Sequence, residues 1–185
     1  MKTLILMTVV ASALGAAAPA AAQLAKGSDA PLDITADELE VQNAQCIQTW
    51  KGSAEALQET SRLRADVIKV YMQPKPNAKP GATSGACGEL IRVEALGSVY
   101  YVTPEQRVHG SNANYEASSE TITITGDVVA ANGQNVMRGD KMVFNTRTGE
   151  GQMQGSGKGG KNRPRGVFYP KKDTDQGASK PGASK

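Results

Sequence analysis

Hydrophobic and polar residues alternate with a period of two through the centre of the chain. One parity of the segment 91–101 is apolar or small, with Ile91, Val93, Ala95, Gly97, Val99 and Tyr101. The opposite parity carries Arg92, Glu94 and Ser98, and the same alternation returns at Ile122 and Ile124 between threonines. Period-two alternation is typical of a strand with one dry and one wet face. Because Gly and Thr interrupt every candidate helix, the sequence predicts an all-β fold.

The chain also repeats itself at an offset of 74 residues. The matched pairs are Leu39 with Ala113, Val41 with Tyr115, Gly52 with Gly126, Leu63 with Met137, Asp66 with Asp140, Ile68 with Met142, and Val70 with Phe144. Repeats of this kind indicate stacked β units that bury a common interior.

The apolar parity changes at two places, each marked by an aspartate. It shifts between Ala65 and Ile68 around Asp66, and again around Asp140 in the segment MRGDKMVF. We interpret each as a corner or bulge where the strand bends. A strand with both faces partly covered is the alternative.

The flanking segments predict a secreted single-domain protein. Lys2, an apolar run over 4–18 and the small residues 20–22 are typical of a cleaved signal peptide over 1–22. The alternative is a membrane anchor, although the run is short of the ~20 residues that span a bilayer. We expect a flexible lead-in over 23–31 and the β domain over 32–154. Residues 73–87 are rich in Pro and Gly and predict a long mobile loop.

Charge divides the expected mature chain into two parts. Residues 23–155 carry 12 Lys and Arg against 16 Asp and Glu, whereas 156–185 carry 8 against 2. The acidic balance of the domain argues against nucleic acid as a partner. The basic segment over 155–185 is of low complexity, apart from an apolar patch at 167–169, and is expected to be mostly disordered.

The two cysteines have two readings. In an oxidising compartment Cys46 and Cys87 can pair, and two free thiols are the alternative. A chain with one His and two well-separated Cys does not predict a metal site.

No arrangement of side chains predicts catalysis. His109 has no second His or nucleophile motif beside it, so we read it as a turn or strand residue. The paired acids Asp37/Glu38 and Asp140/Glu150 are read as solvated groups or turn hydrogen-bond partners. The glycine-rich run after Gly155 lacks a strand–turn–helix setting for phosphate. Neither an enzyme activity nor a cofactor is expected.

The predicted dry face is made of medium-sized, flexible side chains. Its members are Ile34, Leu39, Val41, Leu63, Ile68, Val70, Ile91, Val93, Val99, Ala113, Tyr115, Ile122, Ile124, Met137, Met142 and Phe144. Such an interior either fills itself with side chains or leaves room for an apolar ligand. The residues alone leave both open.

Five segments in order resemble one family. They are ITADELEV, WKGSAEA, LRADVIKVYM, IRVEALGSVYYVTPEQRVHGSNANYE and ITITGDVVAANGQNVMRGDKMVFN. Together they cover about 32–146 and resemble the LptA/OstA family of periplasmic lipopolysaccharide-transport proteins. The resemblance implies an open, twisted β-jellyroll of short antiparallel strands. It also implies that the dry-face residues line a groove for the acyl chains of lipid A.

The resemblance implies partners as well. Protomers would associate end to end through edge strands near 33–41 and 141–154, bridging an LptC-like inner-membrane protein and an LptD-like outer-membrane translocon. The long loop, the two cysteines and the basic tail depart from the simplest family pattern. Two alternatives remain: the periplasmic part of an LptC-like or LptD-like protein, and a secreted structural or adhesive β-protein with a filled core and no ligand.

Overall fold

Antiparallel strands make up all the regular structure in residues 24, 30–76, 87–156 and 163–170, the parts of the chain that the computed structural model describes. The strands are β1 (Asp33–Thr35), β2 (Glu38–Gln42), β3 (Ile47–Gln58), β4 (Ser61–Pro74), β5 (Cys87–Val102), β6 (Arg107–Glu116), β7 (Thr121–Asn132), β8 (Asn135–Asn145), β9 (Gly151–Gln154) and β10 (Arg165–Val167). They form one sheet. The predicted all-β, open antiparallel fold is confirmed.

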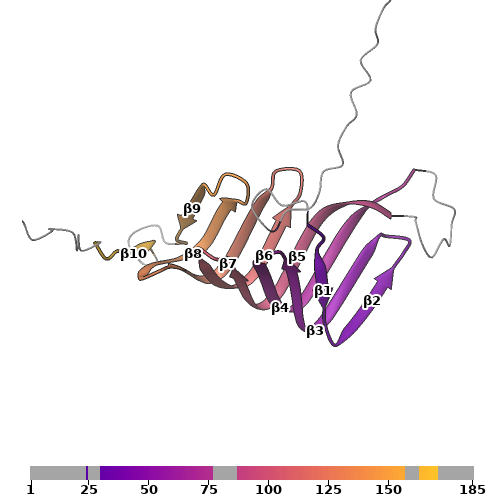
Figure 1. Cartoon of the computed structure of the whole chain (residues 1–185), viewed down its shortest axis with the longest axis horizontal. Helices are drawn as coiled ribbons and strands as arrows, with labels where there is room; N and C mark the ends of the chain where they lie inside the picture. Colours follow the sequence, from indigo (N-terminus) through magenta and orange to yellow (C-terminus); the bar gives the residue numbers. More distant parts are fainter. Residues whose placement is uncertain (1–23, 25–29, 77–86, 157–162, 171–185) are drawn as a thin grey trace, which may run out of the picture.

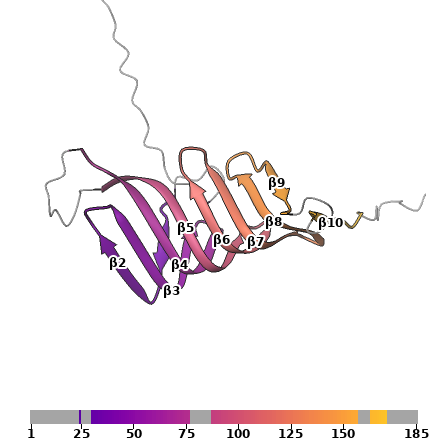
Figure 2. The same ribbon diagram turned by 180° about the vertical axis from the view of Figure 1, so that it is seen from behind.

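Strands β3 to β8 lie side by side in chain order along the long axis of the molecule (Figures 1 and 2). Each end of this stack carries two short strands. β1 and β2 both pair with β3, on different halves of its length. β9 and β10 both pair with β8, at 141–144 and 136–138 respectively. The sheet therefore has two halves that the long strands run through: the first half ends at β2 and β9, and the second half ends at β1 and β10.

Each odd-numbered long strand turns a corner at a glycine. The register shifts on β3 between Lys51 and Ala54, on β5 between Leu96 and Val99, and on β7 between Thr125 and Val128. At each shift a glycine and the next residue both have positive φ: Gly52/Ser53, Gly97/Ser98 and Gly126/Asp127. The strand thereby gains one residue over its neighbour, which is a β-bulge.

The parity change predicted at Asp66 lies on β4, opposite the bulge of β5. On β4 the buried residues change from Leu63 and Ala65 to Ile68 and Val70, while the paired strand β5 supplies the extra residue. The predicted bulge is confirmed, but the left-handed backbone lies at Gly97 of β5 and not at the aspartate. Asp66 packs its carboxyl group where a Cβ of Gly97 would be.

The corners bring the two halves of the sheet face to face around one hydrophobic cluster. Tyr101, near the end of β5, and Phe144, near the end of β8, lie in opposite halves of the sheet. The end of β8 pairs with the start of β7 and not with the strand segments around Tyr101. The rings of Tyr101 and Phe144 nevertheless lie 5.5 Å apart between centroids. Side chains from both halves therefore share a single interior.

The 74-residue repeat is a four-strand repeat in the structure. Cross-strand pairing places both members of each apolar pair in the same row of the sheet, for example Ile68 of β4 and Met142 of β8. Gly52 and Gly126 occupy equivalent corners with φ of 81° and 85°. The predicted stacking around a common interior is confirmed.

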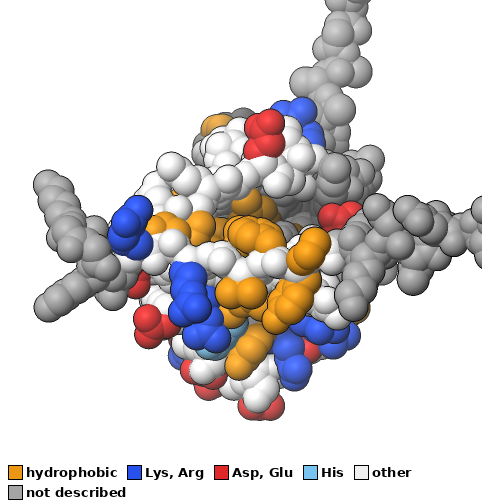
Figure 3. Space-filling model, turned by 90° about the vertical axis from the view of Figure 1, so that its left-hand side faces the viewer, with side chains coloured by type: hydrophobic (Ala, Val, Ile, Leu, Met, Phe, Trp, Pro, Cys, Tyr) orange, Lys and Arg blue, Asp and Glu red, His pale blue; other side chains and the backbone are white. Residues whose placement is uncertain are grey.

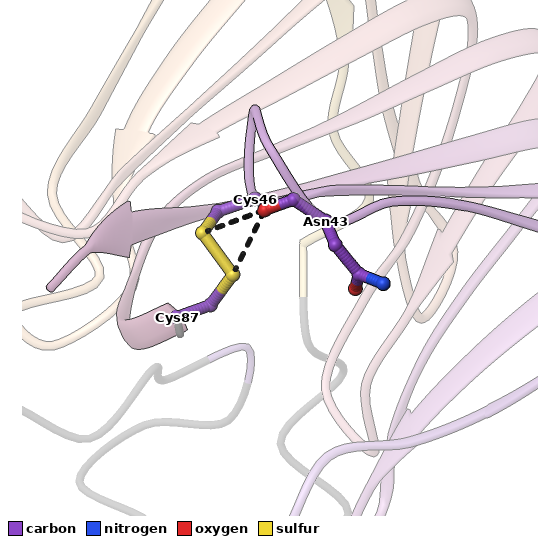
Figure 4. The surroundings of a disulfide bond; sticks show 3 residues. All are labelled: Asn43, Cys46 and Cys87. Carbon is purple, nitrogen blue, oxygen red and sulfur yellow. Dashed lines mark hydrogen bonds between the residues drawn. A yellow bond between two sulfur atoms is a disulfide. The ribbon is translucent and has the colours of Figure 1, made fainter. Parts of the chain in front are cut away.

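Cys46 and Cys87 form a disulfide, with 5.6 Å between their Cα atoms. The bond joins the turn between β2 and β3 to the start of β5, across β4 (Figure 4). The carbonyl oxygen of Asn43 lies 3.7 Å from the sulfur of Cys46 and 3.9 Å from that of Cys87. The bond holds this end of the sheet together.

Two of the expected flexible segments contain ordered structure. Leu24, in the expected lead-in, is 1% exposed within the core cluster. Arg165–Val167, in the expected disordered tail, pairs with β8 as β10. The expected signal peptide and the predicted roles of 77–86 and 171–185 lie outside the described residues.

We expect Gly97→Ala to destabilise the fold by about 2 kcal/mol or more, because alanine resists a φ of 77° and its Cβ would meet Asp66. Gly133→Ala is the matched control, since Gly133 has a φ of 57° with nothing within 4 Å of the added Cβ. It should cost about 1 kcal/mol. If urea unfolding shows that both variants lose the same free energy of unfolding, the Asp66 contact contributes nothing.

Replacing both Cys46 and Cys87 by serine should lower the free energy of unfolding by about 4 kcal/mol, because the loop between residues 41 apart in sequence is no longer closed in the unfolded chain. Thermal unfolding with and without reductant measures this. Reductant should lower the Tm of the natural chain and leave the serine variant unchanged; a shift in both would place the effect elsewhere.

Candidate functional site

Three rows of mainly apolar residues run across the strands on the inner face of the sheet. Directly paired residues share a face. In the first half the rows are Leu39–Trp50–Ile68–Ala95–Ala113–Ile124–Met142–Met153 and Val41–Gln48–Val70–Val93–Tyr115–Ile122–Phe144. In the second half the row is Ile34–Ala56–Leu63–Tyr101–Val108–Ala130–Met137. The interior is thus continuous from one end of the sheet to the other.

Most of the predicted dry-face residues meet in this interior. The buried ones are Leu63, Ile68, Val70, Val93, Val99, Ala113, Tyr115, Ile122, Ile124, Met142 and Phe144. Ile34 and Met137 are partly buried against the same cluster. That these residues bind lipid stays a prediction.

Leu39 and Val41 face the same interior but are not covered. Their pairing with Trp50 and Gln48 places them on the inner face, yet they are 46% and 48% exposed. They lie on β2, which has no further strand beyond it in the described sheet. The interior therefore opens to solvent at this end.

Ile91 does not belong to the interior, contrary to its predicted parity. The register passes from Tyr71–Arg92 directly to Met72–Leu90, so Ile91 is an extra residue that bulges out and is 40% exposed. Leu90 packs against the core instead. Unbroken alternation in the sequence concealed this second bulge of β5.

The prediction missed several interior residues, most of them small. They are Ala54, Ala56, Ala65, Ala95, Tyr101, Val108, Val128 and Ala130, all at most 5% exposed. Ala95 and Tyr101 lie on the predicted apolar parity, so that signal was present. The other alanines were missed because alanine gives only a weak hydrophobic signal, and their burial is set by tertiary packing.

A cavity of about 210 Å³ opens at the β8–β9 end, lined by residues that include Met137, Met142, Phe144 and Met153. Figure 3 views this end and shows hydrophobic side chains gathered at its centre. Methionine side chains are flexible and fit ligands of irregular shape. The interior is thus packed in its middle and open at both ends.

A larger depression of about 720 Å³ lies near the β3–β5 corner, but its lining includes Arg62, Arg64 and Tyr100. Arg64 pairs with Tyr100, and both side chains alternate with inward residues, so they belong to the outer face. Both arginines form ion pairs with Glu55. A charged, open lining is unsuited to an apolar ligand, and the smaller interior cavity is the better candidate.

Hydrogen-bonding side chains also reach into the apolar interior, among them Gln58, Tyr101 and Trp50. Gln58 and Tyr101 are 1% and 3% exposed, and burial raises the pKa of the Tyr101 hydroxyl to about 12. Trp50, the single tryptophan of the chain, buries its indole N–H with no hydrogen-bond partner among the described residues. The interior thus offers hydrogen-bonding groups as well as apolar surface.

The outer face of the first half is polar. Tyr71 donates a 2.7 Å hydrogen bond to Glu94, and the guanidinium of Arg92 lies 4.2 Å from the centre of the Tyr71 ring. Burial, followed by the bond to Glu94, raises the pKa of Tyr71. The sheet therefore separates a wet exterior from a dry interior, as the alternation predicted.

The residues first considered for catalysis have structural contacts. The Nδ1 atom of His109 lies 3.0 Å from the carbonyl oxygen of Val99, and its ring stacks on Tyr100. Asp37 packs over Gly52, and Asp140 accepts a 2.6 Å hydrogen bond from the backbone N–H of Ser156. Among the described residues, no three His, Cys, Asp or Glu are grouped to hold a metal. Nor does any helix there have the length and apolar character to cross a membrane.

Comparison with known proteins agrees with this architecture. Residues 33–150 match the model of the family described as "LptA/(LptD N-terminal domain) LPS transport protein". A protein of Rhizobium meliloti (strain 1021), "Uncharacterized protein R00383", is 25% identical over 131 residues, covering 70% of this chain and 68% of its own length.

A solved structure shares the fold. It is LptH of Pseudomonas aeruginosa, titled "the LptA homologous periplasmic component of the conserved lipopolysaccharide transport device". The TM-score is 0.61 at 16% identity, covering 77% of this chain and 97% of that one.

Proposed function

Because the chain belongs to the family of LptA and LptD N-terminal domain lipopolysaccharide transport proteins, we propose that it carries lipopolysaccharide across the periplasm as one unit of an end-to-end bridge. The bridge runs from an LptC-like inner-membrane protein to an LptD-like outer-membrane translocon. The observation that carries the proposal is the inner face, which is apolar from Leu39 of β2 to Met153 of β9.

Acyl chains bind in this interior by burial. Each methylene removed from water contributes about 0.8 kcal/mol. The sugars of the ligand remain in water along the open side, where the ends of β2 and β9 leave the interior uncovered. No bond of the lipid is made or broken. The chain acts as a shielded path.

The ends of the sheet supply the contacts between protomers. β1 and β2 at one end and β9 and β10 at the other pair on one side only within the described sheet, so each offers backbone groups to an added strand. Exposed apolar side chains accompany them: Leu39 and Val41 at one end, and Val167, Phe168 and Tyr169 at the other. Joining the two ends makes the interior continuous between copies.

A structural β-protein with a filled core is the second candidate, and one observation favours it. The middle of the interior is tightly packed, with Ile68, Ala95 and Ile124 each 0% exposed. A carrier must therefore open or exchange these contacts when a ligand enters. A test at these positions separates the two functions.

Photo-crosslinking probes at Val93 and Ile124 should capture lipopolysaccharide, whereas probes at Arg92 and Thr123 should not, because the first pair faces the interior and the second does not. The periplasmic protein, folded by circular dichroism, is the sample. Lipopolysaccharide on gels of the inward probes alone supports the carrier. Absence of crosslinks at all four positions favours the filled core.

Phe168→Ser with Tyr169→Ser should reduce self-association, measured by sedimentation velocity, because it removes the apolar surface beside β10. Leu39→Ser with Val41→Ser should do the same at the opposite end. Tyr100→Ser is the control, since Tyr100 is 48% exposed but lies on the outer face away from both ends. Unchanged association in both end variants would contradict end-to-end contact.

A further inference from the structure

Two arginines face each other directly on the outer side of the last strand pair. β10 pairs with β8 so that Arg165 lies opposite Arg138. Met137 belongs to the inner row, so its neighbour Arg138 points outward, and directly paired residues share a face. Both arginines are exposed. Like charges in this position destabilise a strand pair, because the two guanidinium groups repel each other.

No carboxylate in the described part of the chain forms an ion pair with either group. The arginines that do form ion pairs there are Arg62, Arg64, Arg92 and Arg147. Arg163, two residues before β10 begins, is a third exposed arginine without an ion pair among those residues. These three arginines therefore form a positive cluster that lacks a bound counter-charge.

A depression of about 270 Å³ opens beside the cluster. Its lining includes Arg138 and Arg163 together with the carboxylates of Asp127 and Asp140. It lies at a notch in the edge of the sheet, because β10 covers β8 at 136–138 and β9 covers it at 141–144. Figure 3, which views this end, shows Lys and Arg side chains bordering the hydrophobic ones. Positive groups and carboxylate oxygens thus surround one small space.

We propose that Arg138, Arg163 and Arg165 bind the phosphate monoester of a sugar phosphate, and that Asp127 and Asp140 accept hydrogen bonds from the adjoining sugar hydroxyls. A phosphate monoester carries close to two negative charges at neutral pH and has three strong acceptor oxygens. The planar guanidinium group of arginine matches such oxygens with paired N–H donors. The site goes beyond the proposed carrier function and does not rest on it.

The two carboxylates determine which phosphate compound fits. They repel a bare anion, whereas hydroxyl groups donate hydrogen bonds to them. Inorganic phosphate has no sugar hydroxyls beside its charge. The phosphodiester of a glycerophospholipid carries a single negative charge and leaves fewer free oxygens for three arginines. A sugar that bears a phosphate monoester supplies both kinds of group at once.

Isothermal titration calorimetry on the full mature chain compares glucose 1-phosphate, inorganic phosphate and glucose. The ionic strength is kept low, because salt at about 0.1 M screens exposed charges beyond roughly 10 Å. We expect glucose 1-phosphate to bind about tenfold more tightly than inorganic phosphate, since its hydroxyls add hydrogen bonds to charged acceptors. Glucose alone should not bind detectably, because it lacks the anion.

Arg138→Gln and Arg165→Gln should each weaken binding of glucose 1-phosphate about tenfold, because each removes a hydrogen bond between two charged groups. Arg107→Gln is the matched control: Arg107 is exposed on the same outer face, but it lies on β6 and does not line the depression. Asp127→Asn should reduce the preference for the sugar phosphate, and asparagine tolerates the φ of 46° at this position. Thermal unfolding confirms that each variant is folded.

Equal affinity for glucose 1-phosphate and inorganic phosphate, or no binding of either, overturns the sugar-phosphate site. Equal weakening in Arg107→Gln overturns it too, because the attraction would then be diffuse. Sedimentation with vesicles of phosphatidylglycerol, but no binding of glucose 1-phosphate, would assign the arginines to a membrane surface instead. A tenfold preference that Arg138→Gln and Arg165→Gln weaken and Arg107→Gln retains supports the site. The crosslinking probes on the inner face test the carrier function separately.

Discussion

The bulge at the middle of each odd-numbered long strand is the constraint on which the fold depends. One extra residue on β5, with Gly97 and Ser98 in the left-handed region, lets the strand bend while Ala95 and Val99 both stay inward. The neighbouring strand β4 bends with one residue fewer and changes parity at Asp66. Since a one-residue slip would turn apolar side chains outward, matched corners are what keep both halves facing one interior.

The ends of the interior are more exposed to solvent than its middle. Strand pairing and the two facing halves bury the central rows almost completely. β2 and β9 are the last strands of the first half, and there Leu39 is 46% exposed and Met153 is only partly buried. The disulfide between Cys46 and Cys87 stabilises one end, and β10 covers part of the other. An end that is held in shape but not closed suits the joining of successive units.

Much of the architecture was predictable, because the period of two and the 74-residue repeat are direct consequences of strand geometry and stacking. The parity change around Asp66 predicted a corner correctly. Ile91 was assigned wrongly because a bulge adds a residue without breaking the local alternation that the prediction relied on. The buried alanines other than Ala95 were missed because alanine gives only a weak hydrophobic signal, and their burial depends on tertiary packing.

The sequence by itself indicated the all-β fold, most of the inward-facing residues and the resemblance to the family, since period-two alternation and short motifs depend on residues near one another in the chain. Tertiary structure decided which contacts cross the fold: Tyr101 against Phe144, Cys46 with Cys87, and the insertion of Leu24 beneath Gln58. Leu24 lies in a segment whose composition suggested flexibility. Its place depends on a buried acceptor 34 residues away, and no local pattern encodes a pairing at that separation.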